Sequence, residues 1–566
     1  MGVRRAVDIV LDIARKKGVR PIYTYGQLIH NPQTVELLRK QGIIPVSTIG
    51  EIDGGIVVIR AHGISPQERA RLKEKGVVIV DATCPKVARV QAIIKKHAGE
   101  GYHVIIVGDG EHPEVSGLLG YAGPKGMVLG QGDNVDNFPP MDRVCVVAQT
   151  TQNAKRFDET VRSIVTRFPH AVIFNTICDS TERRQAEIKK MTSEIDAMVI
   201  VGGKNSANTK RLFEIARSQG TPSFHIETAD ELRHIDLAGA ERIGVSAGAS
   251  TPNWITDGVI DYLTFHLRGK KQRKMEWVYS AGFFAVQTDI YSALGAASLA
   301  VASMLLQGLR VSMLGMGIAA LYVYAMHTIN RLQDRHLGRI TGGFREEIYI
   351  RHRKGYMTAA VSALFLALIL SAALSVGAFI CLFVISLLGV LYNVVVFPRS
   401  LKVKRLRDIP GSKNIFTAAA WGIVTTFIPA MEVTIHPTPP MVCAFLFVCS
   451  IVFVKSTLSD MMEVQSDRLV GRETIPVVMG EAKVRGLIKG IALFLAVMII
   501  AAAGAGYIPM VGTALLISVF YIWICLELCD KRAQFSNAAL EGIFGTNYII
   551  AGVSAVLWFH IERFFT

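Results

Sequence analysis

The sequence has few cysteines, and their spacing argues against one class of protein. Eight cysteines are spread over 566 residues, without the close spacing of a small secreted scaffold held by disulfides. Five of them lie in or near apolar stretches, where a buried free thiol is the ordinary interpretation: Cys381, Cys443, Cys449, Cys525 and Cys529. The first residues also lack the pattern of a cleavable signal peptide. The cysteines therefore give no support for a secreted disulfide framework.

Long apolar runs are absent from the first half of the chain and frequent in the second. Residues 1–265 mix charged residues with short apolar runs, as a soluble α/β protein does. From about residue 280, apolar stretches of roughly 18 to 23 residues follow one another, each long enough to cross a bilayer. Since 566 residues exceed one ordinary core, we expect at least two domains. The expected division is a soluble domain at 1–265, a basic linker at 266–280 and a membrane domain at 281–566.

The formal net charge of +15 has two interpretations, nucleic-acid binding and attachment to a membrane surface. The basic residues cluster in loops beside apolar stretches, which favours the membrane and argues against nucleic acid. Near the junction, basic residues precede Trp277 and Tyr279, as in a juxtamembrane anchor. These basic residues are Arg268, Lys270, Lys271, Arg273 and Lys274.

A repeating pattern in the first half predicts a mainly parallel sheet with helices. From about residue 20, a short apolar run, a polar loop and a helical pattern follow one another. The predicted strands cover 56–59, 77–80, 104–107, 144–147, 172–174, 198–201 and 243–245. Ligands of open α/β sheets bind beyond the carboxyl ends of the strands. We therefore expect the polar loops that follow these strands to build one site.

Taken one at a time, the residues of these loops also have structural explanations. A histidine beside a glycine, such as His62, is often a turn residue, and Cys84 could be a small buried residue. Thr150 and Thr151 could cap the next helix. The recurrence of the same loop chemistry at successive strand ends is what favours a shared site.

Seven motifs of the first half occur together in a fixed order. They are His30-Asn31-Pro32, Ala61-His62-Gly63, Asp81-Ala82-Thr83-Cys84-Pro85, His112-Pro113-Glu114-Val115, Gln149-Thr150-Thr151, Lys204-Asn205-Ser206 and Ala247-Gly248-Ala249-Ser250. With these motifs, residues 1–263 resemble the LytB or IspH family of hydroxymethylbutenyl diphosphate reductases. The resemblance implies a three-lobed α/β fold around a [4Fe–4S] cluster whose open iron binds the substrate hydroxyl. It also implies formation of isopentenyl and dimethylallyl diphosphate by the non-mevalonate route, with electrons from a donor such as ferredoxin or flavodoxin.

The same resemblance implies roles for individual residues. Cys84 and Cys178 would be cluster ligands, and Glu114 would deliver protons with the help of Thr150. The substrate diphosphate would be held by His30, His62, His112, Ser206, Asn208 and Ser250. Histidines and neutral donors suit a diphosphate, and thiolates suit iron–sulfur clusters.

The sequence departs from the family pattern near its start. The family uses three cysteines, the first in a Gly-Phe-Cys turn just before the segment that begins here with Met1, and this cysteine is missing. Cys145 lies within an apolar run and is a poor substitute. A helical apolar stripe ending at Gly18 also lacks a preceding strand, unlike the other predicted helices; it comprises Val3, Ala6, Val7, Val10, Ile13 and Ala14. We expect a start site placed too far downstream, or a truncated chain, rather than degeneration. Ala207 replaces a common serine, which would remove one diphosphate contact.

The second half contains nine candidate membrane spans. They cover 281–304, 311–329, 356–374, 377–397, 415–433, 440–457, 485–504, 507–528 and 543–561. Every second gap between spans is short and nearly free of Lys and Arg, whereas the other gaps are basic. By the positive-inside rule the basic gaps lie in the cytoplasm. We therefore expect a multi-pass inner (cell) membrane protein with its N-terminal domain in the cytoplasm.

Two of the basic gaps also carry acidic groups. The first contains Asn330 and Asp334, and the second contains Asp460, Glu463 and Asp467. A spacing of three or four residues places such oxygens on one helix face, where they can hold Mg²⁺ that bridges phosphates. Acids at these positions could instead cap helices or pair with arginines, but two opposed groups favour a metal site. A basic stretch between them, Lys402-Val403-Lys404-Arg405, suits diphosphate oxygens.

These features, together with the stretch 467–476, make residues 280–566 resemble the UbiA superfamily of intramembrane prenyltransferases. The resemblance implies that a polyprenyl diphosphate ionises between the two acidic loops and alkylates an acceptor. The implied Mg²⁺ ligands are Asn330, Asp334, Asp460, Glu463 and Asp467, and the implied diphosphate ligands are Lys402, Lys404, Arg405 and Arg468. Arg331 and Gly338 stand where many members have Asp, so metal binding at the first loop would be weaker or the acceptor unusual.

Three interpretations of the whole chain follow. The preferred one is a fusion of a reductase with a prenyltransferase, without direct channelling, because chain elongation must intervene between the two reactions. The second is a prenyltransferase whose reductase-like half has no cluster and serves as a docking or diphosphate-binding module. The third is a non-enzymatic membrane scaffold, for which Asp334→Ala and Asp460→Ala would leave activity unchanged.

Overall fold

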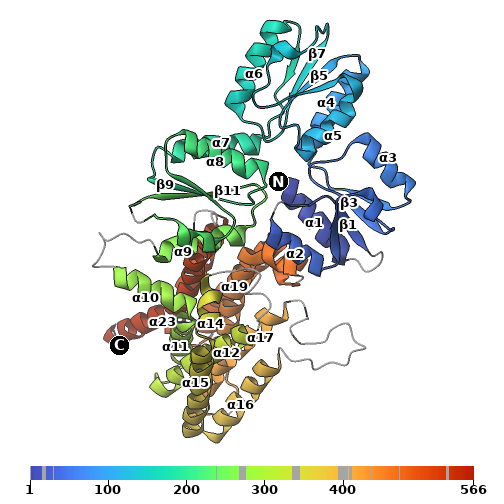
Figure 1. Cartoon of the computed structure of the whole chain (residues 1–566). Helices are drawn as coiled ribbons and strands as arrows, with labels where there is room; N and C mark the ends of the chain where they lie inside the picture. Colours follow the sequence, from blue (N-terminus) through green and yellow to red (C-terminus); the bar gives the residue numbers. More distant parts are fainter. Residues whose placement is uncertain are drawn as a thin grey trace. The chain divides into compact units, whose positions relative to one another are not determined.

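The computed structural model divides into two compact units, unit 1 (Met1–Gly269) and unit 2 (Lys270–Thr566), which are described separately (Figure 1). The described residues are 2–15, 21–29, 31–237, 239–266, 276–333, 344–392, 406, 409, 411–434, 436–470, 472–530 and 535–565. Most of the predicted linker therefore lies outside them.

The described strands of unit 1 form three separate parallel sheets (Figure 1). The first has the order β2 (Ile43–Val46), β1 (Ile22–Tyr25), β3 (Ile56–Ile59), β4 (Val78–Asp81). The second has the order β6 (Gly126–Leu129), β5 (His103–Val107), β7 (Val144–Ala148), β8 (Val172–Phe174). The third has the order β10 (Ser223–Ile226), β9 (Ala197–Val201), β11 (Ile243–Ala247). The predicted parallel α/β fold is confirmed.

The three sheets share one topology. In each sheet the first strand along the chain is flanked by the second strand on one side and by the third on the other. The chain therefore reverses its direction of progress between β1 and β3, between β5 and β7, and between β9 and β11. Loops at such a switch point diverge and leave a crevice at the carboxyl ends of the strands. The polar motifs that follow these strands are thus placed at crevices by topology.

Continuous apolar runs mark the strands that the sequence predicted. Every residue of β7 and of β9 is buried, so these strands are continuous apolar runs, as expected for a parallel sheet covered on both faces. All seven predicted strands are present within a residue or two. The sequence missed β1, β2, β6 and β10, which are four residues long and interrupted by residues such as Pro45 and His225.

Nine helices of unit 1 are described. They are α1 (Gly2–Arg15), α2 (Pro32–Lys40), α3 (Pro66–Glu74), α4 (Pro85–Gly99), α5 (Pro113–Ala122), α6 (Ala154–Arg167), α7 (Asp179–Met191), α8 (Ala207–Ser218) and α9 (Asn253–His266). The helices α2, α3, α4 and α5 begin with proline, whose fixed φ suits the first helical position and whose missing N–H is not needed there. The predicted apolar stripe near the start forms α1, in which Ala6 and Val10 are fully buried.

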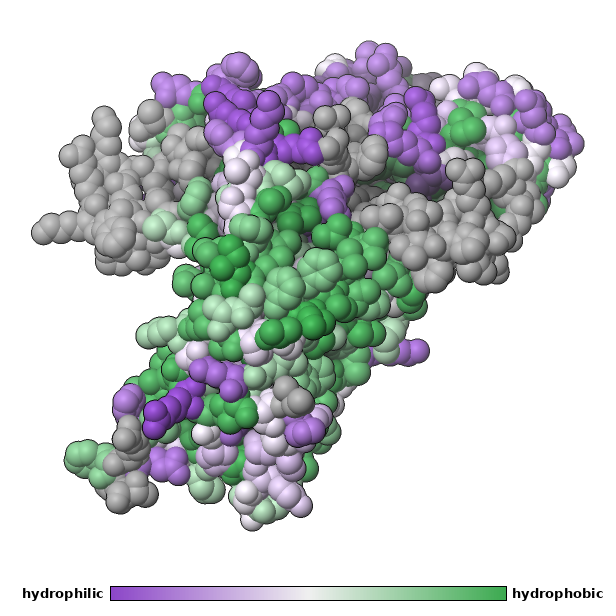
Figure 2. Space-filling view, turned by 90° about the horizontal axis from the view of Figure 1, so that it is seen from below, coloured by the Kyte–Doolittle hydropathy of each residue, from purple (hydrophilic) through white to green (hydrophobic). Residues whose placement is uncertain are grey.

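Unit 2 is helical in its described residues. It contains α10 (Glu276–Gln287), α11 (Ile290–Leu306), α12 (Met313–Gln333), α14 (Phe344–Arg351), α15 (Arg353–Leu374), α16 (Val376–Leu391), α17 (Ser412–Gly422), a π-helical turn (Ile423–Phe427), α18 (Ile428–Ala430), α19 (Pro439–Val470), α20 (Ile475–Met479), α21 (Glu481–Gly504), α22 (Leu516–Asp530) and α23 (Asn537–Phe565). Large side chains such as Phe365, Leu493 and Phe520 are well exposed. Hydrophobic side chains cover a broad continuous area in Figure 2, as lipid contact requires.

The prediction of nine spans is not confirmed. Five helices within the described residues are long and apolar enough to cross a membrane, or up to six if the bent pair of α10 and α11 counts as one span. Each predicted segment does coincide with helical structure, but α16 has only 16 residues. The segment at 415–433 contains a π-helical turn, and α12 carries His327 and Asn330 in its second half. Hydropathy alone does not detect these features.

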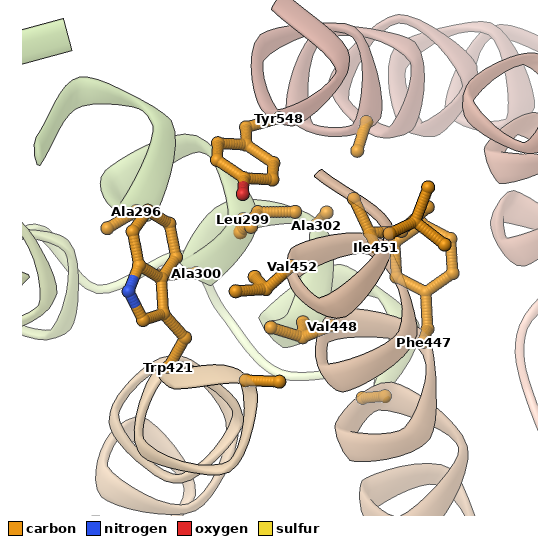
Figure 3. Close-up of a cluster of buried hydrophobic side chains, with 14 of the residues drawn as sticks. Ala296, Leu299, Ala300, Ala302, Trp421, Phe447, Val448, Ile451, Val452 and Tyr548 are labelled. Carbon is orange, nitrogen blue, oxygen red and sulfur yellow. The ribbon is translucent and has the colours of Figure 1, made fainter. Parts of the chain in front are cut away.

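The core of unit 2 joins helices that are far apart in the sequence (Figure 3). Trp421 of α17 lies against Tyr548 of α23, with ring centroids 5.0 Å apart, and Leu299 of α11 is fully buried near them. A side chain at Gly295 would meet the Tyr548 ring, so glycine permits this approach. Small residues at such contacts let membrane helices pack closely. These contacts join α11, α17 and α23 in one core.

Candidate functional site

Four of the predicted site residues of unit 1 are N-cap residues of helices. Cys84 precedes α4, His112 precedes α5, Cys178 precedes α7 and Ser206 precedes α8, each as the N-cap residue. The N-terminus of a helix carries unpaired N–H groups and partial positive charge, which favour phosphates and thiolates. The fold thus places these side chains where anionic ligands are stabilised.

Glu114 is the most deeply buried acid of unit 1. Its side chain is 1% exposed, and it follows β5, while Thr150 follows the neighbouring strand β7. The Thr150 N–H donates to Oε1 at 2.7 Å and the Thr150 hydroxyl donates to Oε2 at 2.8 Å. Burial raises the pKa of Glu114 above its usual range, and the two Thr150 hydrogen bonds oppose that rise only in part. Glu114 therefore keeps its proton to a higher pH than an exposed glutamate, as a proton donor must.

Two of the predicted histidines meet across two sheets. His62 follows β3 and His112 follows β5, and their rings contact edge to face with centroids 5.2 Å apart. The N–H of Glu114 donates to His112 Nδ1 at 3.1 Å. The proton of a neutral His112 ring therefore sits on Nε2, which makes that atom a hydrogen-bond donor. His30 lies outside the described residues.

The remaining predicted diphosphate ligands follow strands of the third sheet. Ser206 and Asn208 come after β9, and Ser250 comes after β11. Asn208 is 7% exposed, and neither Nδ2 nor Oδ1 of its amide has a hydrogen-bond partner among the described residues. A buried amide without partners is costly, so its presence favours a ligand that supplies them. A diphosphate oxygen fits Nδ2.

The two predicted cluster cysteines occupy matching places, after β4 and after β8, the last strands of the first and second sheets. Burial raises the pKa of Cys178, but hydrogen bonds from Ser180 and Thr181 and the charge of Lys86 outweigh it, so the pKa is lowered overall. A lowered pKa favours the thiolate that binds iron.

The described residues of unit 1 show no third cysteine placed to bind an iron–sulfur cluster. Cys145 is fully buried within β7, and burial raises its pKa to about 12, so it remains a thiol. Among the described residues, no group of three or more His, Cys, Asp and Glu side chains is arranged to hold a metal ion. Cys84 and Cys178 fit the role of iron–sulfur ligands, and they are the two strand-end thiols of the described part of unit 1.

In unit 2, the second acidic group lies on α19. Asp460 is 1% exposed and accepts hydrogen bonds from Asn414 Nδ2 at 2.9 Å and from Lys413 Nζ at 3.3 Å. Asp467 is 2% exposed, and its Oδ2 has no partner among the described residues. A buried carboxylate oxygen without a partner fits a cation. Glu463 lies on the same helix and is exposed.

Lys413 and Asn414 are site residues that the sequence did not predict. They lie in the first turn of α17, which begins at Ser412, and Asn414 also donates to Thr457 Oγ1 at 3.1 Å. Their position near the basic stretch could have indicated a role in the site. Their contacts with Asp460 could not be predicted, because they join residues 46 and 47 positions apart in the sequence.

The first acidic group is described only in part. Asn330 and Arg331 lie near the end of α12, whereas Asp334 lies outside the described residues, as do Lys402, Lys404 and Arg405. Arg331 binds Asp289 with two hydrogen bonds, so it does not act as a free cation. Arg468 is half-buried on α19. The Mg²⁺ site predicted from the two loops therefore remains a prediction.

Comparison with known proteins agrees with this geometry in unit 1. Residues 1–264 match the family model described as LytB protein. A 4-hydroxy-3-methylbut-2-enyl diphosphate reductase of Geotalea uraniireducens is 40% identical over 262 residues, which cover 46% of this chain and 92% of the relative. The reductase of the same name from Geobacter sulfurreducens is 42% identical over 260 residues, again 46% and 92%. Residues 1–264 belong to the LytB family.

Residues 290–547 match the model of the UbiA prenyltransferase family. Among solved structures, a diphosphate reductase of Plasmodium falciparum is 29% identical with a TM-score of 0.45, covering 48% of this chain and 87% of that one. A UbiA homolog of Aeropyrum pernix is 11% identical with a TM-score of 0.38, covering 47% and 98%. The chain thus joins a LytB-family domain, from a family of [4Fe–4S] oxidoreductases of isoprenoid biosynthesis, to a UbiA-type prenyltransferase domain in the membrane.

Proposed function

We propose that the LytB-family domain reduces 4-hydroxy-3-methylbut-2-enyl diphosphate to isopentenyl and dimethylallyl diphosphate. The observation that carries this proposal is Glu114, a buried acid of raised pKa bound by Thr150 beside His112 and His62. The allylic C–O bond breaks, two electrons and two protons are taken up, and water leaves. A bound [4Fe–4S] cluster would supply electrons and a Lewis-acidic iron. Electrons would reach it from a donor such as ferredoxin or flavodoxin.

The chain's own residues would do the rest. His112 Nε2–H, His62, Ser206, Asn208, Ser250 and His30 would hold the diphosphate. Cys84 and Cys178 would hold the cluster, at helix N-termini that stabilise their thiolates. Glu114 would hold the proton for the leaving hydroxyl, and Thr150 would stabilise the carboxylate left behind.

We further propose that the UbiA-type domain transfers a longer prenyl chain from its diphosphate to an acceptor in the membrane, with Mg²⁺. The buried Asp460 and the unpartnered Oδ2 of Asp467 support a cation site on α19. Asn330, Asp334 and Glu463 would complete it, and Lys402, Lys404, Arg405 and Arg468 would bind the diphosphate. Basic gaps between the apolar segments support an inner-membrane location with unit 1 in the cytoplasm.

The test uses the full chain in detergent or nanodiscs, reconstituted with iron and sulfide without oxygen. We expect both five-carbon diphosphates with a reduced low-potential dye as donor, and loss of product in Glu114→Gln. In parallel, we expect transfer of a labelled prenyl chain that needs Mg²⁺ and is lost in Asp460→Asn. Absence of the first product with a fully loaded cluster would overturn the reductase proposal, and Mg²⁺-independent transfer would overturn the second.

A second candidate function is a prenyltransferase with a cluster-free docking domain. The amide of Asn208, which has no partner among the described residues, supports it, because a diphosphate can occupy that side chain whether or not a cluster is bound. Iron content and visible absorbance of the reconstituted chain decide between the two. A chain that transfers prenyl groups but holds no iron would favour the docking domain.

A further inference from the structure

The chain breaks sharply between α10 and α11 at a buried acid. The two helices meet at an angle of 84°, and Asp289 at the break is 1% exposed. Its φ of 62° is left-handed, and among the described residues it is the one non-glycine residue with a positive φ. Such a conformation costs roughly 1 to 3 kcal/mol and persists where the surroundings hold it, often at functional sites.

The Asp289 carboxylate is held from two other helices. Arg331 of α12 donates from Nε to Oδ2 and from a terminal nitrogen to Oδ1, both at 3.1 Å, in a two-pronged pair. The hydroxyl of Tyr349 on α14 donates to Oδ2 at 2.8 Å. Tyr349 is 2% exposed, so these bonds are shielded from water.

The positions of these donors along the chain are informative. Arg331 lies directly after Asn330, near the end of α12, and Tyr349 lies on α14, the next described helix. One carboxylate therefore ties the end of α12 to α14 and to the α10–α11 break. Arg331, like Gly338, stands where the resemblance to the UbiA superfamily leads us to expect an acid. Its role as a partner of Asp289 gives that departure a structural meaning.

Stability alone is a poor explanation of this arrangement. Asp289 is fully buried, whereas the Arg331 side chain is 28% exposed. Burying the Asp289 charge is expensive, and well-packed apolar residues in place of such a pair are often as stable or more stable. An ion pair with a buried carboxylate on a strained backbone favours a role in holding geometry.

We propose that Asp289 is a positioning residue of the prenyltransferase site, which fixes the end of α12 and hence Asn330 through Arg331 and Tyr349. The inference rests on the proposed Mg²⁺-dependent prenyl transfer. Asp289 does not touch the substrate in this proposal; it sets where the oxygen of Asn330 lies. Loss of this anchor weakens Mg²⁺ and prenyl diphosphate binding more than it weakens the fold.

The test compares full-length variants for Mg²⁺ half-saturation, KM, kcat and unfolding temperature in detergent. Tyr349→Phe removes one hydroxyl, and Tyr521→Phe is the matched control, because its hydroxyl bonds the Ile543 carbonyl at 3.1 Å elsewhere in the bundle. We expect equal unfolding temperatures for the two, with Mg²⁺ half-saturation raised about fivefold or more only in Tyr349→Phe.

The double variant Asp289→Asn with Arg331→Met separates positioning from folding. It removes both charges together, and asparagine tolerates the left-handed conformation and still accepts the Tyr349 hydroxyl, so we expect a near wild-type unfolding temperature with Mg²⁺ half-saturation and KM raised roughly tenfold or more. Wild-type kinetics in this double variant, or equal kinetics in Tyr349→Phe and Tyr521→Phe, would overturn the positioning role of Asp289 and leave the proposed function standing. Lack of prenyl transfer in the wild type and in Tyr521→Phe would overturn the proposed function and the inference with it.

Discussion

Replacing Thr150 with valine isolates one hydrogen bond of the proposed reductase. Valine keeps the shape of threonine and the 2.7 Å bond from the backbone N–H, but it loses the 2.8 Å bond from the hydroxyl to Glu114 Oε2. The carboxylate is 1% exposed, so water does not replace the lost donor. A hydrogen bond to a charged group is worth about 1.5 to 3 kcal/mol. If Glu114 becomes negative as it gives up its proton, turnover falls roughly ten- to 150-fold.

The assay is turnover of the full, cluster-loaded chain as a function of pH. The hydroxyl lowers the pKa of Glu114, so its loss raises that pKa further, and the fall of activity at high pH moves to higher pH. Thr150→Ser is the control, because serine keeps the hydroxyl. Wild-type turnover in Thr150→Val, or an equal loss in Thr150→Ser, would refute this account of Glu114.

Three more predictions concern unit 1 of the full chain. The raised pKa of Glu114 contributes stability that is fully present below its unfolded pKa and is lost as pH rises through its folded pKa. Glu114→Gln should therefore flatten the decline of unfolding temperature with pH, measured by heat-induced labelling of the buried Cys145. An unchanged dependence of unfolding temperature on pH would contradict this. Lys86→Ala removes a charge that lowers the pKa of Cys178, so alkylation of this thiol in the cluster-free chain should slow at neutral pH, whereas Lys86→Arg should not slow it. Asn208→Ala removes an unpaired buried amide, so the ligand-free chain should be as stable as the wild type or up to about 1 kcal/mol more stable. The KM of the reductase should rise. Marked destabilisation would show that the amide has a structural partner.

Local patterns predicted much of the fold, and they failed where the pattern was interrupted. Strands buried on both faces, such as β7 and β9, are continuous apolar runs and were predicted. The short strand β2 contains Pro45 and was missed. The segment predicted at 440–457 continues as one helix to Val470, so Asp460 and Asp467 lie on a helix and not in a loop.

The candidate sites show the same limit. The strand-end positions of Cys84, His112 and Cys178 followed from the order of motifs along the chain. Lys413, Asn414 and Asp289 did not, because each acts through partners more than 40 residues away. Residue type and spacing do not show which distant side chains will meet.

The sequence by itself determined the division into an α/β half and an apolar helical half and the placement of polar loops at strand ends, because hydropathy and periodicity are local properties of the chain. The tertiary structure alone decided that the pKa of Glu114 is raised and that Arg331 pairs with Asp289. Those properties depend on burial and on contacts across 36 and 42 residues, and they arise only when the chain is folded.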